Sequence, residues 1–460
     1  MDAIATETSS IPPGPKGYWV VGNLPDFMGD LFGFLTRCAR DHGDIVSLRL
    51  GLHPAILLNH PDQIEEVLVS RQADFIKYRF FWRHVTRVFG NGLLTSAGEL
   101  WQRQHTLMAP AFRHERLALS ADQMAGCALR LADLWHDGEA RAIRCDMTRL
   151  TLEIVAKVLF AVDLAGEVER ISQAVDRGSE EISRRFKRGL FLPDWLPTPG
   201  NRRYMATVRD LDAVAAHILA ERRAPDRRPG DLLSALLQSR DAEGRPLDAQ
   251  LLRDEVVTLL LAGHETTALA LTWTLYLLSR HPKITARVEE EIDKVLGPER
   301  LPGAADLGRL RYLGWVIMEA MRLYPPVYIL GREAIRDVAI GGYRLSRGTI
   351  CLMSQWVVHR DPRFFPEPEA FKPERWDAAC PRQRPRMAYF PFSGGPRICI
   401  GQPLAMMEAK LVLATLCQRF RFAATAGPPI RPYPSVTLRP DRPVRLVVSR
   451  RALARATSSS

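Results

Sequence analysis

The cysteines of this sequence lack the spacing of disulfide pairs or of a metal site. Its seven cysteines are scattered over 460 residues, and none stands in the Cys/Cys or Cys/His spacing of a zinc site. An odd, scattered set argues against structural disulfides and for a reducing compartment. We therefore expect a cytoplasmic protein without a disulfide framework.

An apolar N-terminal segment is also missing. Residues 1–11 contain Asp2, Glu7 and two serines but no apolar core, so neither a signal peptide nor a transmembrane anchor is expected there. No Ser/Gly linker, low-complexity tract or internal repeat divides the remainder. The sequence predicts a disordered segment over 1–11, one domain over 12–450 and a tail over 451–460.

What is present is the composition of an ordinary globular protein, with 46% hydrophobic and 25% charged residues. The net charge is +11, from 63 Lys and Arg against 52 Asp and Glu. Such a charge permits nucleic acid, an anionic membrane or an acidic protein as partner. Charge alone selects none of them.

Most of the chain shows a helical pattern, with short β-rich stretches near both ends. Helices are expected over 31–41, 61–68, 101–110, 251–279, 313–324 and 402–419. Strands are expected over 45–50, 55–58, 337–340 and 349–353, with a final hairpin from 435–438 and 444–448. An apolar loop over 188–202 fits a mobile lid, a membrane-touching patch or a loop folded onto the core.

A single cysteine ends a loop rich in glycine and proline. Residues 392–401 read Phe-Ser-Gly-Gly-Pro-Arg-Ile-Cys-Ile-Gly, and the helical pattern from Gln402 follows at once. Glycines allow amide groups to wrap around the sulfur, and the helix N-terminus favours a thiolate. Cys399 is therefore either a metal-ligating thiolate or a buried small apolar residue, and the loop alone leaves both interpretations open.

The stretch 251–279 is long, apolar and interrupted at its centre by His264, Glu265 and two threonines. A membrane span would have to bury those charges, and a zinc helix would need a histidine at position 268, which is Ala268. We therefore expect a helix through the middle of a large domain. The small residues 262 and 263 would let a molecule approach, and the threonine hydroxyls would bond to carbonyls four residues earlier.

Two further groups combine polar residues with apolar surroundings. Glu319 and Arg322 lie three apart on a helix whose neighbours imply burial, with Arg375 as a candidate third member of a structural network. Trp101 and His105 lie four apart on another helix and could reach one ligand. Core packing is the more common explanation of such an aromatic pair.

Together these stretches resemble the cytochrome P-450 family of haem-thiolate monooxygenases. The haem-binding signature of that family is matched by Phe392, Gly395, Arg397, Cys399 and Gly401. Its oxygen-activation motif is matched by residues 262–267, and its structural triad by Glu319, Arg322 and Arg375. The motifs occur in the family's order. The resemblance implies a mainly α fold with small β-sheets, in which haem lies between the long central helix and the helix after Cys399.

The resemblance also implies roles for the matched residues. Cys399 would be the axial thiolate of haem b and would favour cleavage of bound dioxygen. Glu265 and Thr266 would relay protons, while Ala262 and Gly263 would leave room for dioxygen. The haem propionates would be held by Arg332, Arg397 and His105, with Trp101 in support; many family members carry arginine at the position of His105.

Substrate and electron donor follow from the same resemblance. The expected substrate contacts are mostly apolar and suggest a terpenoid, a steroid or a fatty compound: Phe80, Phe81, Trp82, Val85, Leu259, Val327, Ile329, Val436 and Leu438. Electrons from NAD(P)H would arrive through a separate ferredoxin and its reductase, or a flavoprotein. An acidic donor would meet a basic surface near Arg113, Arg382, Arg384 and Arg386. No nucleic-acid partner is expected.

Two other functions compete with monooxygenation. A haem-thiolate enzyme that uses or isomerises peroxides is the second candidate, but such enzymes commonly lack the acid and threonine present as Glu265 and Thr266. A haem-based binding or sensor protein is the third, and in it a complete proton relay would serve no purpose.

Overall fold

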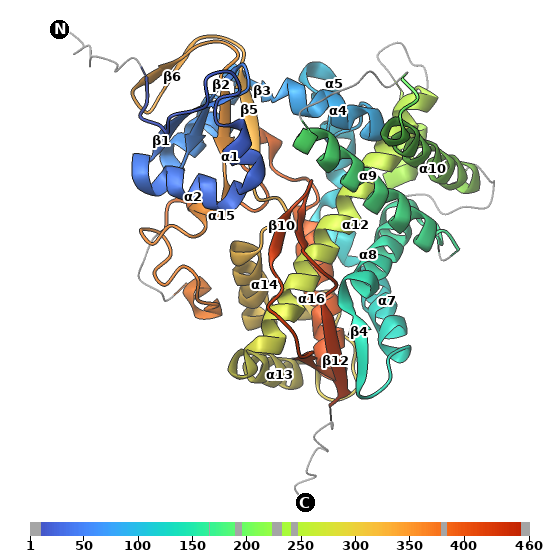
Figure 1. Ribbon diagram of the computed structural model, residues 1–460. Coiled ribbons are helices and arrows are strands. Elements are labelled where there is room, and N and C mark those ends of the chain that lie inside the picture. Colours follow the sequence, from blue (N-terminus) through green and yellow to red (C-terminus); the bar gives the residue numbers. More distant parts are fainter. Residues whose placement is uncertain are drawn as a thin grey trace, which may run out of the picture. The chain divides into compact units, whose positions relative to one another are not determined.

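The computed structural model describes residues 11–164, 166–188, 196–222, 232–240, 247–378 and 384–451 (Figure 1). The expectations for residues 1–10, for 189–195 in the loop 188–202, for Arg382 and for the tail after 451 therefore concern residues outside the described ranges. The chain forms two compact units. The first comprises residues 1–84, 322–370 and 381–399, and the second comprises 85–321, 371–380 and 400–460.

The first unit is built on a five-stranded sheet with the order β1-β2-β8-β5-β3. The predicted N-terminal hairpin is confirmed, because β1 (Ile45–Leu50) and β2 (His53–Leu58) pair antiparallel around the turn at Gly51. β2 then pairs parallel with β8 (Ile350–Met353), whose four residues are all buried. β5 (Leu330–Ala334) pairs with both β8 and β3 (Phe75–Lys77). A separate hairpin joins β6 (Val338–Ile340) and β7 (Tyr343–Leu345).

Short helices surround this sheet and supply its core. The helices of this unit are α1 (Leu24–Gly29), α2 (Leu31–His42), α3 (Pro61–Glu65) and α15 (Gln355–Val358). The helix expected over 61–68 divides into α3 and a π-helical turn at Glu66–Ser70, and a 3-10 turn at Gln72–Asp74 follows. Side chains of the π-helical turn, including Val67 and Leu68, belong to the apolar core with Ile56 and Phe390.

The second unit is mainly helical. Its helices are α5 (Gly98–Met108), α6 (His114–Ala118), α7 (Ala121–Asp133), α8 (Ile143–Phe160), α9 (Val168–Arg188), α10 (Pro199–Arg222), α11 (Leu232–Gln238), α12 (Ala249–Arg280), α13 (Pro282–Leu296) and α16 (Gln402–Arg419). Two helices continue from one unit into the other: α4 (Arg79–Phe89) and α14 (Arg311–Leu323). The mainly α architecture with small sheets agrees with the prediction.

The long apolar stretch forms α12, which packs against α8, α10 and α16 (Figure 1). Among the described residues it is the one helix long and apolar enough to cross a membrane, and 78% of its most apolar window is buried inside the protein. Burial against neighbouring elements accounts for its composition. The predicted central helix is therefore confirmed, with bounds 249–280.

The predicted final hairpin is wrong. β11 (Leu438–Pro440) pairs with β10 (Pro432–Pro434), whereas β12 (Arg445–Arg450) pairs with β9 (Phe420–Ala424) and β4 (Glu139–Ala142). Prolines 440 and 443 lack the amide N–H groups that a continuous ladder between β11 and β12 would use. β12 instead alternates, with Leu446 and Val448 buried in the second unit.

Candidate haem-binding and oxygen-activation site

The loop before Cys399 is tightly folded against the first unit. Gly395 has φ +67, and a Cβ at this position would lie 1.9 Å from the carbonyl oxygen of Leu68. Only glycine tolerates both the left-handed backbone and this approach. The amide of Cys399 donates to the carbonyl of Phe392 at 2.9 Å, which closes the loop. Cys399 itself is exposed, whereas four other cysteines are buried.

A buried histidine supports the segment that leads into this loop. His359 is fully buried, and its Nε2 accepts a hydrogen bond from the amide of Phe390 at 3.0 Å. Burial, followed by the charges of Arg322 and Arg360, holds the pKa of His359 well below its usual value. The ring therefore stays neutral and can serve as an acceptor. Sequence reasoning missed this residue.

Each of the two charged residues of α14 has several hydrogen-bond partners. Arg322 is fully buried and donates to the carbonyls of His359, Pro368 and Ala370. Glu319 accepts from Arg375 Nε at 2.8 Å, as well as from the Lys372 amide and the Trp376 indole. Both charges are thus satisfied by several hydrogen bonds, which is the condition for burying them.

At the centre of α12, two threonine hydroxyls donate to carbonyls four residues earlier, as predicted. Thr266 Oγ1 donates to the carbonyl of Ala262 at 2.8 Å, and Thr267 Oγ1 donates to that of Gly263 at 3.0 Å. His264 is fully buried and bonds to the carbonyl of Leu260. Burial lowers its pKa, so His264 is a neutral packing residue, in line with the interpretation that it points away from the site.

The position that a side chain would take at Gly263 faces α8. A Cβ at Gly263 would lie 3.0 Å from Val155 Cγ2 of α8. The missing side chain therefore lets α8 and α12 pack closely. The expectation that Ala262 and Gly263 leave room for dioxygen stays a prediction.

Glu265 is held by residues that sequence reasoning did not select. Its Oε1 accepts hydrogen bonds from Thr437 Oγ1 at 3.0 Å and from Arg439 Nε at 3.0 Å. Arg439 also forms an ion pair with Asp176 of α9 at 3.0 Å. The expected substrate residues Val436 and Leu438 stand on either side of Thr437, but nothing in the sequence links this segment to an acid on α12.

The aromatic residues expected to bind haem lie on α5, and those expected to contact the substrate lie on α4. On α5, the rings of Trp101 and His105 are 5.1 Å apart, so the two residues do share a face. On α4, Trp82 stacks its ring under the ammonium of Lys77 at 4.7 Å, and its ring lies 5.5 Å from that of Phe81.

Other expected substrate residues differ in exposure. Leu259 and Val85 are 7% and 2% exposed, and Leu438 is fully buried. Val327 and Val436 are half-buried, and Ile329 packs on the apolar cluster between α2 and the sheet. Contact of these residues with substrate stays a prediction.

Three cations gather in the first unit. Lys77 of β3 and Arg332 of β5 are directly opposite in the antiparallel ladder, a position where like charges destabilise a sheet. Burial, then repulsion from Arg397 and Arg332, lowers the pKa of Lys77 well below its usual value. Burial lowers the pKa of Arg332 to about 10, and burial followed by repulsion from Arg332 does the same for Arg397.

A group with two negative charges would offset this repulsion. The two propionates of haem have that charge, and the exposed thiol of Cys399 in the same unit is a ligand of the kind that binds haem iron. The residues present therefore fit haem. Lys77 was not selected from the sequence because its role depends on its ladder partner.

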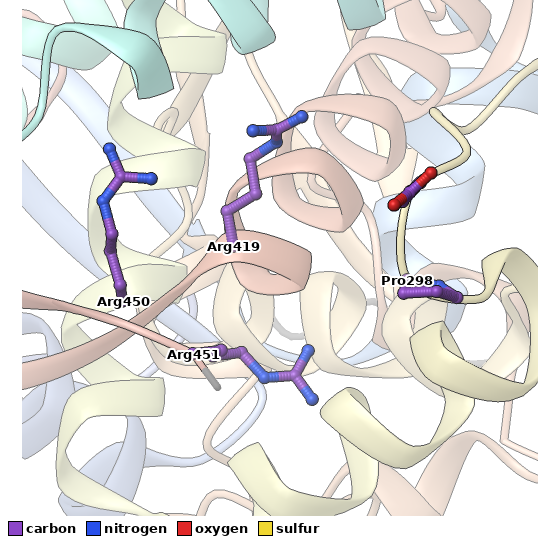
Figure 2. A pocket seen from close by; sticks show the side chains of 5 residues that line it. Pro298, Arg419, Arg450 and Arg451 are labelled. Carbon is purple, nitrogen blue, oxygen red and sulfur yellow. The ribbon is translucent and has the colours of Figure 1, made fainter. Parts of the chain in front are cut away.

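The second unit contains a recess of about 250 Å³ lined by arginines (Figure 2). Its lining residues are Pro298, Glu299, Arg419, Arg450 and Arg451. Arg451 donates to the carbonyls of Cys417 and Gln418 at the end of α16 and pairs with Asp293. This arginine therefore stabilises a helix C-terminus. None of the candidate site residues lines the recess.

A mainly helical fold, an exposed cysteine in a glycine-rich loop and a half-buried group of cations are typical of one class, the haem-thiolate proteins. The chain belongs to the cytochrome P-450 family, whose model matches residues 12–448. It is 36% identical over 409 residues to cyclooctatin synthase of Streptomyces melanosporofaciens, covering 88% of each chain. It is 34% identical over 440 residues to pentalenene oxygenase of Streptomyces avermitilis, covering 95% of this chain and 97% of the relative.

A third relative, cyclooctat-9-en-7-ol 5-monooxygenase of Streptomyces melanosporofaciens, is 35% identical over 441 residues, which cover 94% of this chain and 93% of the relative. Membership of the family makes the chain an oxidoreductase, a monooxygenase that uses haem b and receives electrons from NAD(P)H through a redox partner. Its substrate is a hydrophobic small molecule.

Proposed function

We propose that this protein hydroxylates a cyclic terpenoid, with Cys399 as the thiolate ligand of haem. The observation that carries the proposal is the exposed thiol of Cys399 at the end of a loop closed by Phe392 and Gly395. Two similar proteins bear names that describe oxygenation of pentalenene and of cyclooctat-9-en-7-ol, which are terpenoids. The apolar character of the expected substrate residues supports a substrate of the same chemistry.

We assign the following roles in haem binding to residues of this chain. Lys77, Arg332 and Arg397 would bind the propionates and orient the ring, with Trp101 and His105 in support. Haem with a thiolate ligand supplies the reductive activation of dioxygen when it is bound. Phe392, Gly395 and Gly401 would shape the loop that presents the sulfur. Glu319, Arg322 and Arg375 would hold the surrounding backbone.

Proton supply would fall to Glu265 and Thr266. The Thr266 hydroxyl donates to the Ala262 carbonyl. Rotation about χ1 would turn this hydroxyl toward the active site, where it can donate a proton and be reprotonated through Glu265. The redox partner would be a ferredoxin or a flavoprotein with an acidic surface, and the reaction would take place in the cytoplasm within a domain formed by residues 12–450.

The carbon monoxide difference spectrum of the reduced protein tests the ligand. We expect the strongly red-shifted Soret band of thiolate-ligated haem. The Cys399→Ser variant should lose this band. Cys145→Ser is the matched control, because Cys145 is the other exposed cysteine of the described chain and should leave the band in place. A wild-type spectrum typical of histidine ligation would contradict the proposal.

The substrate class is tested by the spin-state shift of the purified protein with a library of apolar compounds. Cyclic terpenoids are expected to give the largest shifts. Shifts confined to fatty acids would contradict the terpenoid assignment and leave the haem-thiolate assignment intact.

A further inference from the structure

The hairpin of β10 and β11 directs polar side chains at two helices of the second unit. Ser435 Oγ lies 2.9 Å from Ser183 Oγ of α9, and Thr437 Oγ1 donates to Glu265 of α12. Arg439 reaches both helices, through Asp176 on α9 and Glu265 on α12. The hairpin thus ties the acid of the oxygen-activation motif to α9.

Within the described ranges, the hydrogen bonds to the Glu265 carboxylate all fall on one oxygen. Thr437 Oγ1, Arg439 Nε and Arg439 Nη2 all donate to Oε1. Among the described residues, no hydrogen bond occupies Oε2. A carboxylate has about four acceptor sites over its two oxygens, so one oxygen is anchored and the other stays available. Oε1 is unsuitable for a proton, because three donors already point at it.

The residue that anchors Glu265, Arg439, is permanently charged and almost excluded from solvent. The Arg439 side chain is 10% exposed and that of Glu265 is 14% exposed. Burial lowers the pKa of Arg439, but Glu265 and then Asp176 raise it by more, and the net shift is upward. Asp176 is held in turn by Arg144 of α8 at 3.0 Å. A chain of alternating charges, Arg144, Asp176, Arg439 and Glu265, therefore spans α8, α9, β11 and α12.

We propose that Arg439 and Thr437 are positioning residues that fix Glu265 by Oε1, so that Oε2 is the atom that carries protons toward Thr266. Asp176 fixes Arg439 from α9. The inference rests on the proposed function for the reaction that these protons serve. The geometry itself, one anchored and one available oxygen, is independent of that reaction.

The proposal sets a specific expectation for removal of the anchor. Without Arg439, the Glu265 carboxylate would rotate, and either oxygen could face either way. Proton delivery would then slow, and electrons would be lost to peroxide or water. Substrate affinity should change little, because the hydrogen bonds of the anchor are made to Glu265 and Asp176.

The test uses the haem-loaded protein with its redox partners and a turnover substrate from the spin-shift screen. Arg439→Gln should lower product formed per NAD(P)H at least fivefold and raise the ratio of turnover rates in H₂O and D₂O. The spin-shift Kd should stay within twofold of wild type. Arg439→Lys, which keeps the charge, should recover part of the coupling. Thr437→Val, which leaves the ion pair intact, should change coupling in the same direction by about twofold.

Arg421→Gln is the matched control. Arg421 of β9 also binds a carboxylate, with Nε donating to Glu289 Oε1 at 3.0 Å and Nη2 to Oε2 at 2.8 Å, and neither residue belongs to the oxygen-activation motif. Arg421→Gln should leave the product formed per NAD(P)H and the ratio of turnover rates in H₂O and D₂O at wild-type values. If Arg439→Gln fails to fold in urea titrations, Arg439→Lys and Thr437→Val decide the question by the same readouts.

A double-mutant cycle separates positioning from a general structural effect. Once Glu265 is replaced by Gln, adding Arg439→Gln should change coupling no further, because the anchored acid is already gone. In urea unfolding, the same cycle should show an interaction of at least fivefold in the unfolding equilibrium constant. Additive effects on coupling, or wild-type coupling in Arg439→Gln, would overturn the inference. A failed proposed function would show itself earlier, as a wild-type protein without the thiolate spectrum.

Discussion

At the scale of single residues, the same chemical group serves different purposes according to its position. Four threonines of α12, at 266, 267, 272 and 274, bond to the carbonyl one turn earlier. Such back-bonding satisfies a hydroxyl inside an apolar helix. Thr272 and Thr274 are fully or almost fully buried, whereas Thr266 is half-buried beside the acid at 265. Exposure, and not the hydrogen bond, singles out Thr266.

Thr266→Ala should therefore uncouple electron consumption from product formation. The hydroxyl that we propose as the proton donor would be missing, so product per NAD(P)H is expected to fall several-fold, with excess peroxide or water. Stability should change by about 1 kcal/mol or less. Simultaneous measurement of NAD(P)H, peroxide and product checks this.

Thr272→Ala is the control for that measurement, since it removes an equivalent hydrogen bond about 1.7 turns further along the helix. It should keep wild-type coupling. Equal coupling in Thr266→Ala and wild type would mean that oxygen is activated by another route.

At the scale of elements, the loop before α16 depends on backbone conformation more than on side chains. The chain must approach the π-helical turn Glu66–Ser70 so closely that Gly395 meets the carbonyl of Leu68. Sequence reasoning recognised a glycine-rich loop but could not identify which segment it would touch. Leu68 is more than 300 positions away, and its pairing with Gly395 is a purely tertiary contact.

Gly395→Ala should destabilise the protein by more than about 3 kcal/mol, through left-handed strain of about 1–2 kcal/mol plus a clash with backbone that cannot move aside. Gly348→Ala is the matched control in the same unit. Gly348 also has a positive φ, +88, but a Cβ there would meet nothing within 4 Å.

Gly348→Ala should cost only the strain, about 1–2 kcal/mol. Urea unfolding of both variants gives the comparison. Equal losses would mean that the approach to Leu68 is unimportant.

At the scale of the whole molecule, burial of charge decides how stability responds to pH. Glu255 of α12 is fully buried, and its Oε2 accepts from the Leu93 amide at 2.9 Å while Oε1 has no partner among the described residues. Burial raises the pKa of Glu255 from 4.5 to about 8. The folded protein therefore keeps this proton at pH values where the unfolded chain has released it.

The sign of the pH dependence follows. Because the unfolded chain binds fewer protons between pH 4.5 and 8, the contribution of Glu255 to the free energy of unfolding falls as pH rises through this window and levels off above it. The slope is at most about 1.4 kcal/mol per pH unit.

Glu255→Gln cannot ionise and should remove this slope, so its stability relative to wild type rises between pH 5 and pH 8. Urea midpoints over that range, with Glu290→Gln on the exposed face of α13 as control, measure the effect. Parallel curves for wild type and Glu255→Gln would show that the carboxyl is already ionised in the folded protein.

The sequence by itself determined the family, the central helix and the N-terminal hairpin, and it predicted the roles proposed for Cys399, Glu265 and Thr266. These follow from local periodicity and from motifs whose residues are close together in the chain. The π-helical turn and the partner of β12 were not predictable from local patterns. In both cases distant segments compete for the same hydrogen bonds and core positions.

Only the tertiary structure decided what surrounds the chemical groups. It placed Arg439 and Thr437 on Glu265, more than 170 positions away, and set Lys77 opposite Arg332 in a ladder. Ion pairs and cross-strand neighbours form between residues that leave no joint signal in a single sequence. Their energy depends on distance and burial, and both are properties of the folded chain.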